Sequence, residues 1–121
     1  SLPTVLETEE LLDLQRLSHQ VYVEPSVRGY ITALTRATRN HADIRLGASP
    51  RSSLGLHSAA QALAAIQGRS YVIPDDVKSL SIPVLAHRLL IKAEARMRGK
   101  TEEDVLREIL ECLPVPLEES L

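Results

Sequence analysis

The residue in this sequence best placed for chemistry is an arginine near the start of a predicted helix. The run Gly-Ala-Ser-Pro-Arg at residues 47–51 combines a turn glycine with a serine suited to the N-cap and a proline suited to the first helical position. Arg51 then stands in the first turn, beside backbone N–H groups that have no partner within the helix. A cation there opposes the helix dipole, so a bound anion would relieve the repulsion, and the forked donors of arginine suit phosphate. Local physics alone leaves a solvated arginine as the simpler interpretation and phosphate binding as the alternative.

The helix that carries Arg51 is predicted to run to about Gln67 and to end at Gly68, a typical C-terminal glycine. At about 100° per residue, Arg51 lies well off the apolar stripe of this helix and should project outward. Many residues of the helix are small, which lets another helix approach closely. The predicted stripe consists of Leu56, Ala59, Ala60, Leu63 and Ile66.

The rest of a nucleotide site is missing from the sequence. There is no Gly-x-x-x-x-Gly-Lys-Ser/Thr segment and no hydrophobic strand ending in acids that would hold Mg²⁺, so the chain cannot by itself be a conventional NTPase. No metal-ligand spacing and no nucleophilic triad stand out among His19, His41, His57 and His87, so we predict neither a metal site nor a catalytic residue. Cys112, the only cysteine, falls in an apolar stripe and is predicted to be a small core residue.

Composition indicates one small aliphatic domain. The chain has 121 residues, 44% of them hydrophobic, with no Phe or Trp, so Leu, Val, Ile and Ala must fill its core. The formal net charge of −2 opposes general nucleic-acid binding, which needs a cationic surface. No apolar run approaches the roughly 20 residues that span a bilayer, and no signal peptide is visible, which favours a cytoplasmic location.

Another amphipathic helix is predicted to begin at Pro25, with Glu24 as its candidate cap. Apolar residues recur along it at helical spacing, and the opposite side is basic. A solvated face is the simpler interpretation of these arginines, and contact with a partner is the alternative. The predicted inner face holds Val27, Tyr30, Ile31, Leu34 and Thr38, and the outer face holds Arg28, Thr32, Thr35, Arg36 and Arg39.

The remaining pattern predicts a mainly α chain, a small helical bundle with two or three very short strands. Residues 40–48 are interpreted as a loop, and residues 21–23 and 71–73 as short extended stretches. A helix opening at Pro74, with two acids in its first turn, is expected to break near Ser81–Ile82 because Pro83 lacks an N–H. We also predict a short helix capped by Thr8 that carries Leu11, Leu12 and Leu14, a strand or helix end at 88–91, a turn at Gly99, and a last helix from Thr101 with Leu106, Ile109, Leu110 and Leu113 as its stripe.

Several of these motifs, taken in order, resemble the C-terminal lid of MoxR-type AAA+ ATPases. The resemblance covers roughly residues 8–116, and the ordered combination is more specific than any one motif. One departure is Ile73, which stands where the family often has Thr and removes a side-chain N-cap worth roughly 1 kcal/mol. The matching segments are Tyr30-Ile31, Thr38-Arg39, residues 47–51, Gly68-Arg69, Tyr71-Val72, Pro74-Asp75-Asp76-Val77, Val84-Leu85, His87-Arg88 and Pro114-Val115-Pro116.

The resemblance implies a helical lid at residues 8–116, a link from a missing ATPase core at 1–7, and a loose acidic tail at 117–121. It implies that Arg51 is the sensor 2 arginine, which contacts the γ-phosphate of ATP bound with Mg²⁺ on that core. It also implies a homo-oligomeric bacterial-type ring with chaperone-like action on a client protein. Arg28, Arg36 and Arg39 are candidates for contact with a neighbouring subunit.

Two other functions are compatible with the sequence. A free-standing helical module that docks on a protein partner would need no ATPase core. A helix-turn-helix DNA binder would use the helix at residues 49–67, but the net charge and the shortage of polar base-reading side chains oppose it.

Overall fold

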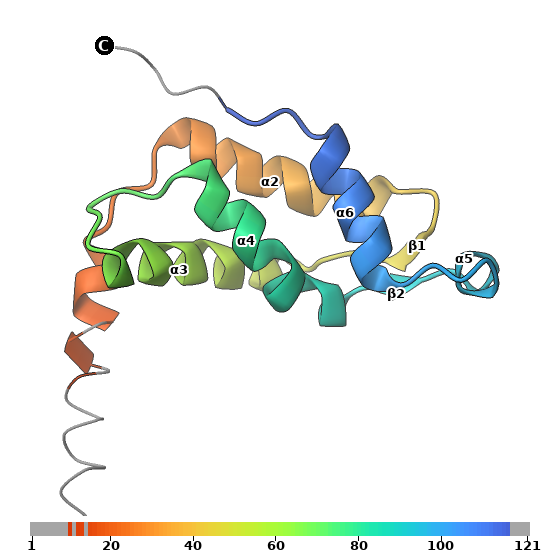
Figure 1. Ribbon diagram of the computed structural model, residues 1–121, viewed down its shortest axis with the longest axis horizontal. Helices are drawn as coiled ribbons and strands as arrows, with labels where there is room; N and C mark the ends of the chain where they lie inside the picture. Colours follow the sequence, from red (N-terminus) through yellow and green to blue (C-terminus); the bar gives the residue numbers. More distant parts are fainter. Residues whose placement is uncertain (1–9, 11, 14, 117–121) are drawn as a thin grey trace, which may run out of the picture.

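The computed structural model describes residues 10, 12–13 and 15–116 (Figure 1). The predicted link at 1–7, the tail at 117–121 and the Thr8 cap, with Leu11 and Leu14, lie outside the described residues. Residue 10 and residues 12–13, which include Leu12 of the predicted short helix, are helical, and so are residues 15–19, for which the sequence makes no prediction. No helix among the described residues is both long enough and apolar enough to cross a membrane.

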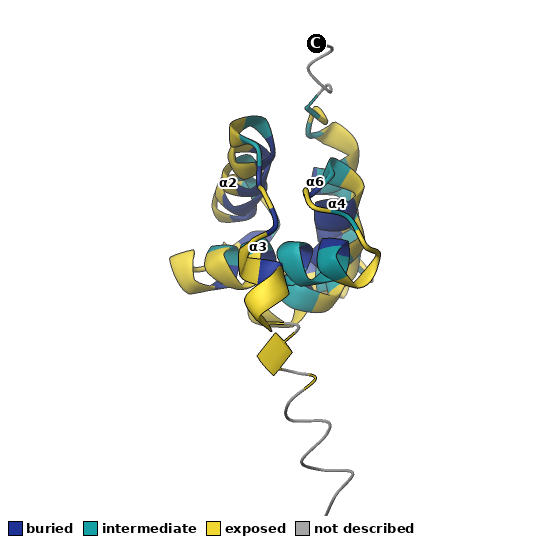
Figure 2. Cartoon of the chain, turned by 90° about the vertical axis from the view of Figure 1, so that its left-hand side faces the viewer, coloured by how far each residue is buried: buried dark blue, intermediate teal, exposed yellow. Residues whose placement is uncertain are grey.

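Four longer helices build the domain, and their buried sides face one another (Figures 1 and 2). They are α2 (Pro25–Asn40), α3 (Pro50–Ile66), α4 (Pro74–Leu85) and α6 (Glu102–Cys112). Smaller elements connect them: β1 (Ile44–Leu46), a 3₁₀ turn at Ala86–Arg88, β2 (Leu90–Ile91) and α5 (Ala93–Met97). The mainly α prediction is confirmed, whereas α5 has no counterpart in the sequence-based expectation.

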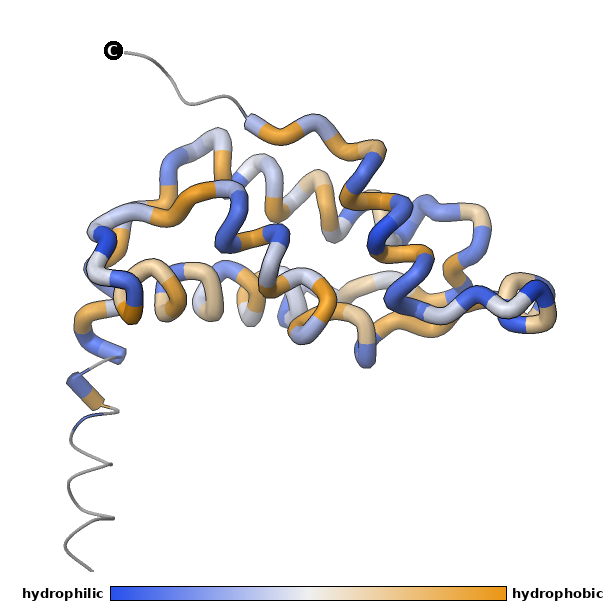
Figure 3. Tube along the Cα trace, viewed as in Figure 1, coloured by the Kyte–Doolittle hydropathy of each residue, from blue (hydrophilic) through white to orange (hydrophobic). Residues whose placement is uncertain are grey.

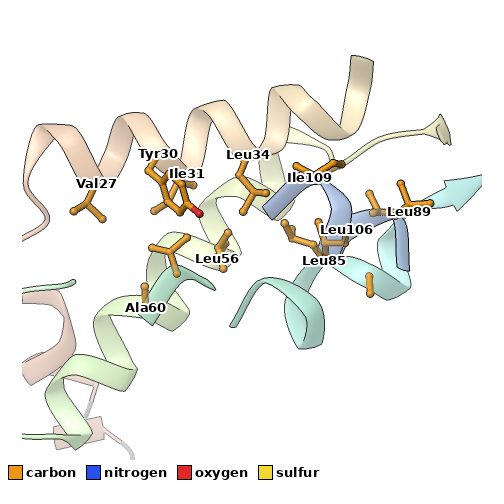
Figure 4. Packing of buried hydrophobic residues seen from close by; sticks show 14 of the residues in the cluster. Val27, Tyr30, Ile31, Leu34, Leu56, Ala60, Leu85, Leu89, Leu106 and Ile109 are labelled. Atoms are coloured by element: carbon orange, nitrogen blue, oxygen red, sulfur yellow. The ribbon is translucent and has the colours of Figure 1, made fainter. Parts of the chain in front are cut away.

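The core is aliphatic, and each of the four longer helices contributes a leucine to it. Leu34, Leu56, Leu85 and Leu106 are fully buried, one from each helix (Figure 4). The hydropathy pattern follows the same arrangement, with apolar positions recurring along each helix (Figure 3). Because the core contains few large side chains, it depends on close approach between helices, and small residues make that approach feasible on α3.

The buried side of α3 differs in part from the predicted stripe. The buried residues are Ser52, Leu56, Ala60 and Ala64, a row with a spacing of four. Ile66, predicted to lie in the stripe, is 66% exposed because the helix ends there, beyond the packed region. Gly68 follows with φ +75°, the left-handed conformation that ends a helix and that glycine adopts without strain.

α2 begins at Pro25 as predicted, but the side chain of Glu24 makes no capping hydrogen bond. Its inner face is confirmed, with one addition. Thr35, placed on the outer face by its polarity, is only 3% exposed. Its hydroxyl donates to the carbonyl of Thr32 at 3.0 Å, so the helix itself satisfies the buried oxygen and the residue can face inward.

The loop predicted at residues 40–48 contains a strand. β1 pairs antiparallel with β2, with Ile44 opposite Ile91 and Leu46 opposite Leu90. A second extended contact is a parallel bridge between Tyr22 and Tyr71, which joins the two predicted extended stretches. These pairings connect segments far apart in the sequence, so local periodicity carries little information about them.

The predicted helix break at Ser81–Ile82 does not occur. α4 runs from Pro74 to Leu85 with Pro83 inside it. Proline removes one backbone hydrogen bond, and because Pro83 is close to the C-terminal end the helix continues for only two residues beyond it. Ser81 is fully buried and its hydroxyl donates to the carbonyl of Val77 at 2.6 Å, so the last turns stay packed against the core.

Candidate functional site

The candidate site is the start of α3, where Arg51 leaves the body of the domain. Ser49 is the N-cap, and its hydroxyl oxygen accepts a hydrogen bond from the backbone N–H of Ser52 at 3.2 Å. Pro50 occupies the first helical position, as predicted. Ser52 turns inward and is buried, whereas Arg51 is exposed. The helix start therefore directs the arginine to solvent.

Within the described part of the chain, Arg51 makes no ion pair with a carboxylate. Arg69, Arg96, Arg98 and Arg107 each pair with an acid, whereas Arg36, Arg45 and Arg88 are, like Arg51, exposed and without an ion pair among the described residues. The guanidinium of Arg51 stands near the positive end of α3, and no described acid neutralises it. This position suits an anion supplied from outside the domain.

The turn before the helix is held against α2. The backbone N–H of Ala48 donates to the hydroxyl oxygen of Thr38 at 2.9 Å, and Nε of Arg39 donates to the carbonyl of Ala48, also at 2.9 Å. A side chain at Gly47 would begin only 2.8 Å from the backbone of Arg39, so this position requires glycine for the close approach. Arg39, predicted as a subunit contact, thus has a partner inside its own domain.

The opposite end of α3 is tied to the start of α4. Arg69 donates to both carboxylate oxygens of Asp76, at 2.7 and 2.6 Å, and to the carbonyl of Tyr71 at 3.0 Å. The hydrogen bonds that Arg69 donates to Asp76 are the main cause that raises the pKa of the Arg69 guanidinium. Asp76 also accepts from the N–H of Ile73 at 2.9 Å, so it serves the helix start as predicted and closes a buried ion pair as well.

The other predicted arginines of α2 lie on its exposed face. Arg36 is exposed, and Arg28 borders a pocket between α2 and α3 that is also lined by Tyr22, His57 and Gln61. Burial first, and the charge of Arg28 second, lower the pKa of His57. No described hydrogen bond joins Arg28 or Arg36 to the turn before Arg51. Of the three predicted arginines of α2, only Arg39 bonds to that turn among the described residues.

A charged cluster that the sequence did not indicate joins the β1 end of the domain to α6. Lys100 Nζ lies 2.8 Å from Asp43 and 2.9 Å from Glu108, and His41 Nε2 lies 3.3 Å from Glu108. Hydrogen bonds from Lys100 lower the pKa of both carboxyl groups. His41, Asp43 and Glu108 have potential ligand atoms within 4.8 Å of one another, but the ammonium of Lys100 already contacts both carboxylates. The arrangement is that of an ion-pair network.

Cys112 is exposed at the last turn of α6, so its assignment to the core is wrong. The buried residues of α6 are Val105, Leu106 and Ile109, and Leu110 and Leu113 are half-buried against the core, whereas Cys112 between them is exposed.

A family model for the AAA lid domain matches residues 36–109, which include the turn, Arg51 and the Arg69–Asp76 pair. The chaperone MoxR1 of Mycobacterium tuberculosis is 34% identical over 121 residues, covering 93% of this chain and 32% of that protein. The chain belongs to the AAA lid domain family, in the MoxR group. The resemblance inferred from the sequence motifs is therefore confirmed.

The chain is also similar to a further curated protein and to a solved structure. The uncharacterized protein YeaC of Bacillus subtilis is 38% identical over 120 residues, covering 99% of this chain and 38% of that protein. A crystal structure of a "putative ATPase" from Cytophaga hutchinsonii has a TM-score of 0.78 and 27% identity, over 84% of this chain and 34% of that one. The lid domain thus spans about a third of the length of the relatives it matches.

Proposed function

We propose that the lid domain supplies Arg51, as the sensor 2 arginine, to ATP bound with Mg²⁺ on an AAA+ core outside this chain. The observation that carries the proposal is the placement of Arg51 itself. It is exposed in the first turn of a capped helix and has no ionic partner among the described residues. A triphosphate that approaches this end of α3 would meet the guanidinium and the positive end of the helix dipole together.

The chemistry required of Arg51 is electrostatic. Negative charge on the γ-phosphate and on the leaving oxygen is stabilised by a cation held in place before the reaction, and arginine suits this role because it stays protonated. When the γ-phosphate is lost, the arginine loses its partner and the preferred angle between lid and core changes. The lid domain would pass this change to the rest of the assembly.

We further propose that the intact protein works as a homo-oligomeric ring that remodels a client protein in a chaperone-like manner. The relative from Mycobacterium tuberculosis is named a chaperone, and this name supports the proposal. Arg28 and Arg36 on the exposed face of α2 are the candidates for contact with a neighbouring subunit. The greater length of the relatives supports a lid that works beside a core, in preference to a free-standing interaction module.

The test is steady-state ATP hydrolysis by a protein that contains both the core and this lid domain. Arg51→Ala should lower kcat on the order of 10²-fold, as removal of a preorganised charge donor does in other active sites. Arg45→Ala is the matched control, because Arg45 is an exposed arginine on β1, outside the turn at residues 47–49 and outside α3. If Arg51→Ala turns over ATP at the rate of the control, Arg51 is not the sensor.

A further inference from the structure

Two residues of α2 contact the turn before Arg51 in a way that fixes the direction of that turn. Thr38 is fully buried, and its hydroxyl proton is already donated to the carbonyl of Thr35 at 2.6 Å. The oxygen therefore presents its lone pairs to the N–H of Ala48, 2.9 Å away. Because the hydroxyl cannot rotate without losing its hydrogen bond to Thr35, its lone pairs stay available to the N–H of Ala48.

The carbonyl of Ala48, which belongs to the next peptide unit, is held by Arg39. Its Nε–H donates to the carbonyl of Ala48 at 2.9 Å. Ala48 is 1% exposed, and buried backbone groups need hydrogen-bond partners. Side chains of α2 supply both partners, one for the N–H and one for the carbonyl. Gly47 adds a third restraint, since the chain passes so close to α2 here that a β-carbon at this position would lie 2.8 Å from the backbone of Arg39.

Ala48 is followed immediately by the N-cap Ser49 and, three residues on, by Arg51. An anchor at Ala48 therefore sets where α3 begins and in which direction its first turn faces. A shift of about 1 Å in a positioning element can lower the rate of a reaction by on the order of 10²-fold, even when the element does not touch the reacting atoms.

We propose that Thr38 and Arg39 are positioning residues for the phosphate-contacting arginine, and that they act by clamping the backbone of Ala48 on both sides of its α-carbon. This inference rests on the proposed function of Arg51. It also gives Arg39 a role different from the subunit contact expected from its exposed charge. In this role the geometry of Nε–H matters, and the positive charge alone does not suffice.

The experiment is a kinetic double-mutant cycle in a protein that contains core and lid. Thr38→Val keeps the shape of the side chain and removes the acceptor of the Ala48 N–H, and it should lower kcat by roughly tenfold or more. Thr38→Ser retains the hydroxyl and should restore most of the rate. In the Arg51→Ala background, Thr38→Val should cause no further loss of kcat, because the clamp works only through Arg51.

Arg39→Lys separates the clamp from a charge contact. Lysine keeps the positive charge but has a methylene where arginine has Nε–H, so the clamp predicts a fall in kcat close to that of Arg39→Ala. A subunit contact that needs only charge predicts a rate close to wild type. Ser81→Ala is the stability control: it removes another buried hydroxyl, on α4, that does not touch the turn, and should leave kcat unchanged.

The outcomes distinguish the two proposals. If Arg51→Ala does not change kcat, the proposed function fails. If Arg51→Ala lowers kcat but Thr38→Val lowers it by the same factor with or without Arg51, the clamp is wrong. The clamp is also wrong if Arg39→Lys has wild-type kinetics, or if the loss from Thr38→Val is matched by Ser81→Ala. Should Thr38→Val fail to fold, Arg39→Lys alone, assayed with and without Arg51, gives the same decision.

Discussion

Arg69 and Asp76 form a two-pronged ion pair that connects the end of α3 to the first turn of α4. Asp76 is 3% exposed and the side chain of Arg69 is 21% exposed, so water screens the pair weakly. The same carboxylate accepts from the N–H of Ile73 at 2.9 Å, and the N–H of Asp76 donates to the carbonyl of Ile73 at 3.0 Å. Asp76 thus accepts the N–H of Ile73 at a helix start that lacks a side-chain cap. The same carboxylate also ties the end of α3 to the start of α4.

Removing the charge of Asp76 should destabilise the domain strongly. Asp76→Asn keeps the size of the side chain but leaves Arg69 without its counter-ion, and breaking such a pair costs about 3 kcal/mol. The measurement is the urea midpoint of the isolated domain, with Asp75→Asn as the control because Asp75 is the exposed neighbour in the same turn. Equal midpoints for the two variants would show that the pair contributes nothing particular.

The cluster around Lys100 should make stability depend on pH in the acid range. The pKa values of Asp43 and Glu108 lie below their ordinary 3.8 and 4.5, first because Lys100 donates hydrogen bonds to each. The two carboxyl groups therefore bind protons more readily in the unfolded chain than in the folded one. Their contribution to the stability of the fold is complete above about pH 4.5, and it is lost as the pH falls through their pKa values in the folded state.

The same cluster should also make the stability of the domain depend on pH in the alkaline range. Hydrogen bonds to Asp43 and Glu108 raise the pKa of Lys100 above 10.5, so its contribution is present below that pH and is lost as pH rises through the folded value. Thermal melts from pH 3 to pH 11 measure both limbs. Lys100→Met should flatten them, and a variant with an unaltered acid limb would argue against Lys100 as the source.

The hydroxyl of Tyr30 is a buried polar group with no hydrogen-bond partner among the described residues. Burial, and secondarily the charge of Asp75, raise its pKa. Tyr30→Phe removes the unsatisfied group and keeps the ring, so stability should stay equal or rise by about 1 kcal/mol. Tyr71→Phe, at an exposed tyrosine, controls for the loss of a hydroxyl. A clear loss of stability in Tyr30→Phe alone would reveal a partner that the hydroxyl needs.

Cys112 should react with a water-soluble thiol reagent in the folded state. Its exposure at the end of α6 means that labelling requires no unfolding, and the adduct should leave the melting temperature unchanged. The rate in buffer is compared with the rate in denaturant, where the thiol is fully accessible. Labelling that occurs only in denaturant would restore the core assignment made from the sequence.

Much of the fold follows from local signals. Pro25, Pro50 and Thr101 each mark a helix start that the structure contains, because capping and proline geometry act within one turn. The turn glycines Gly68 and Gly99 have positive φ, as their positions predict. The start of α3, and with it the exposure of Arg51, belongs to this locally determined part of the structure.

The errors and omissions come from tertiary packing. Ile66 continues an apolar period past the end of the packed region, and Cys112 is exposed although Leu113 after it packs against the core. The period itself does not reveal which of its positions are covered. The contacts of Ala48 with α2, and of Lys100 with Asp43, join residues that are distant in the chain. The sequence placed Thr38 on the inner face of its helix and Arg39 on the basic outer face. Their joint hold on the backbone of Ala48 required the structure.

The central claim is that Arg51 meets the γ-phosphate, and the most direct measurement is the ratio of dissociation constants for a non-hydrolysable ATP analogue and ADP. It is made on the core-plus-lid protein, with Arg45→Ala as the control. Arg51→Ala should weaken binding of the ATP analogue about tenfold or more and leave ADP binding unchanged, because only the triphosphate carries the group that the arginine contacts. Equal weakening of both nucleotides, or of neither, would contradict the account.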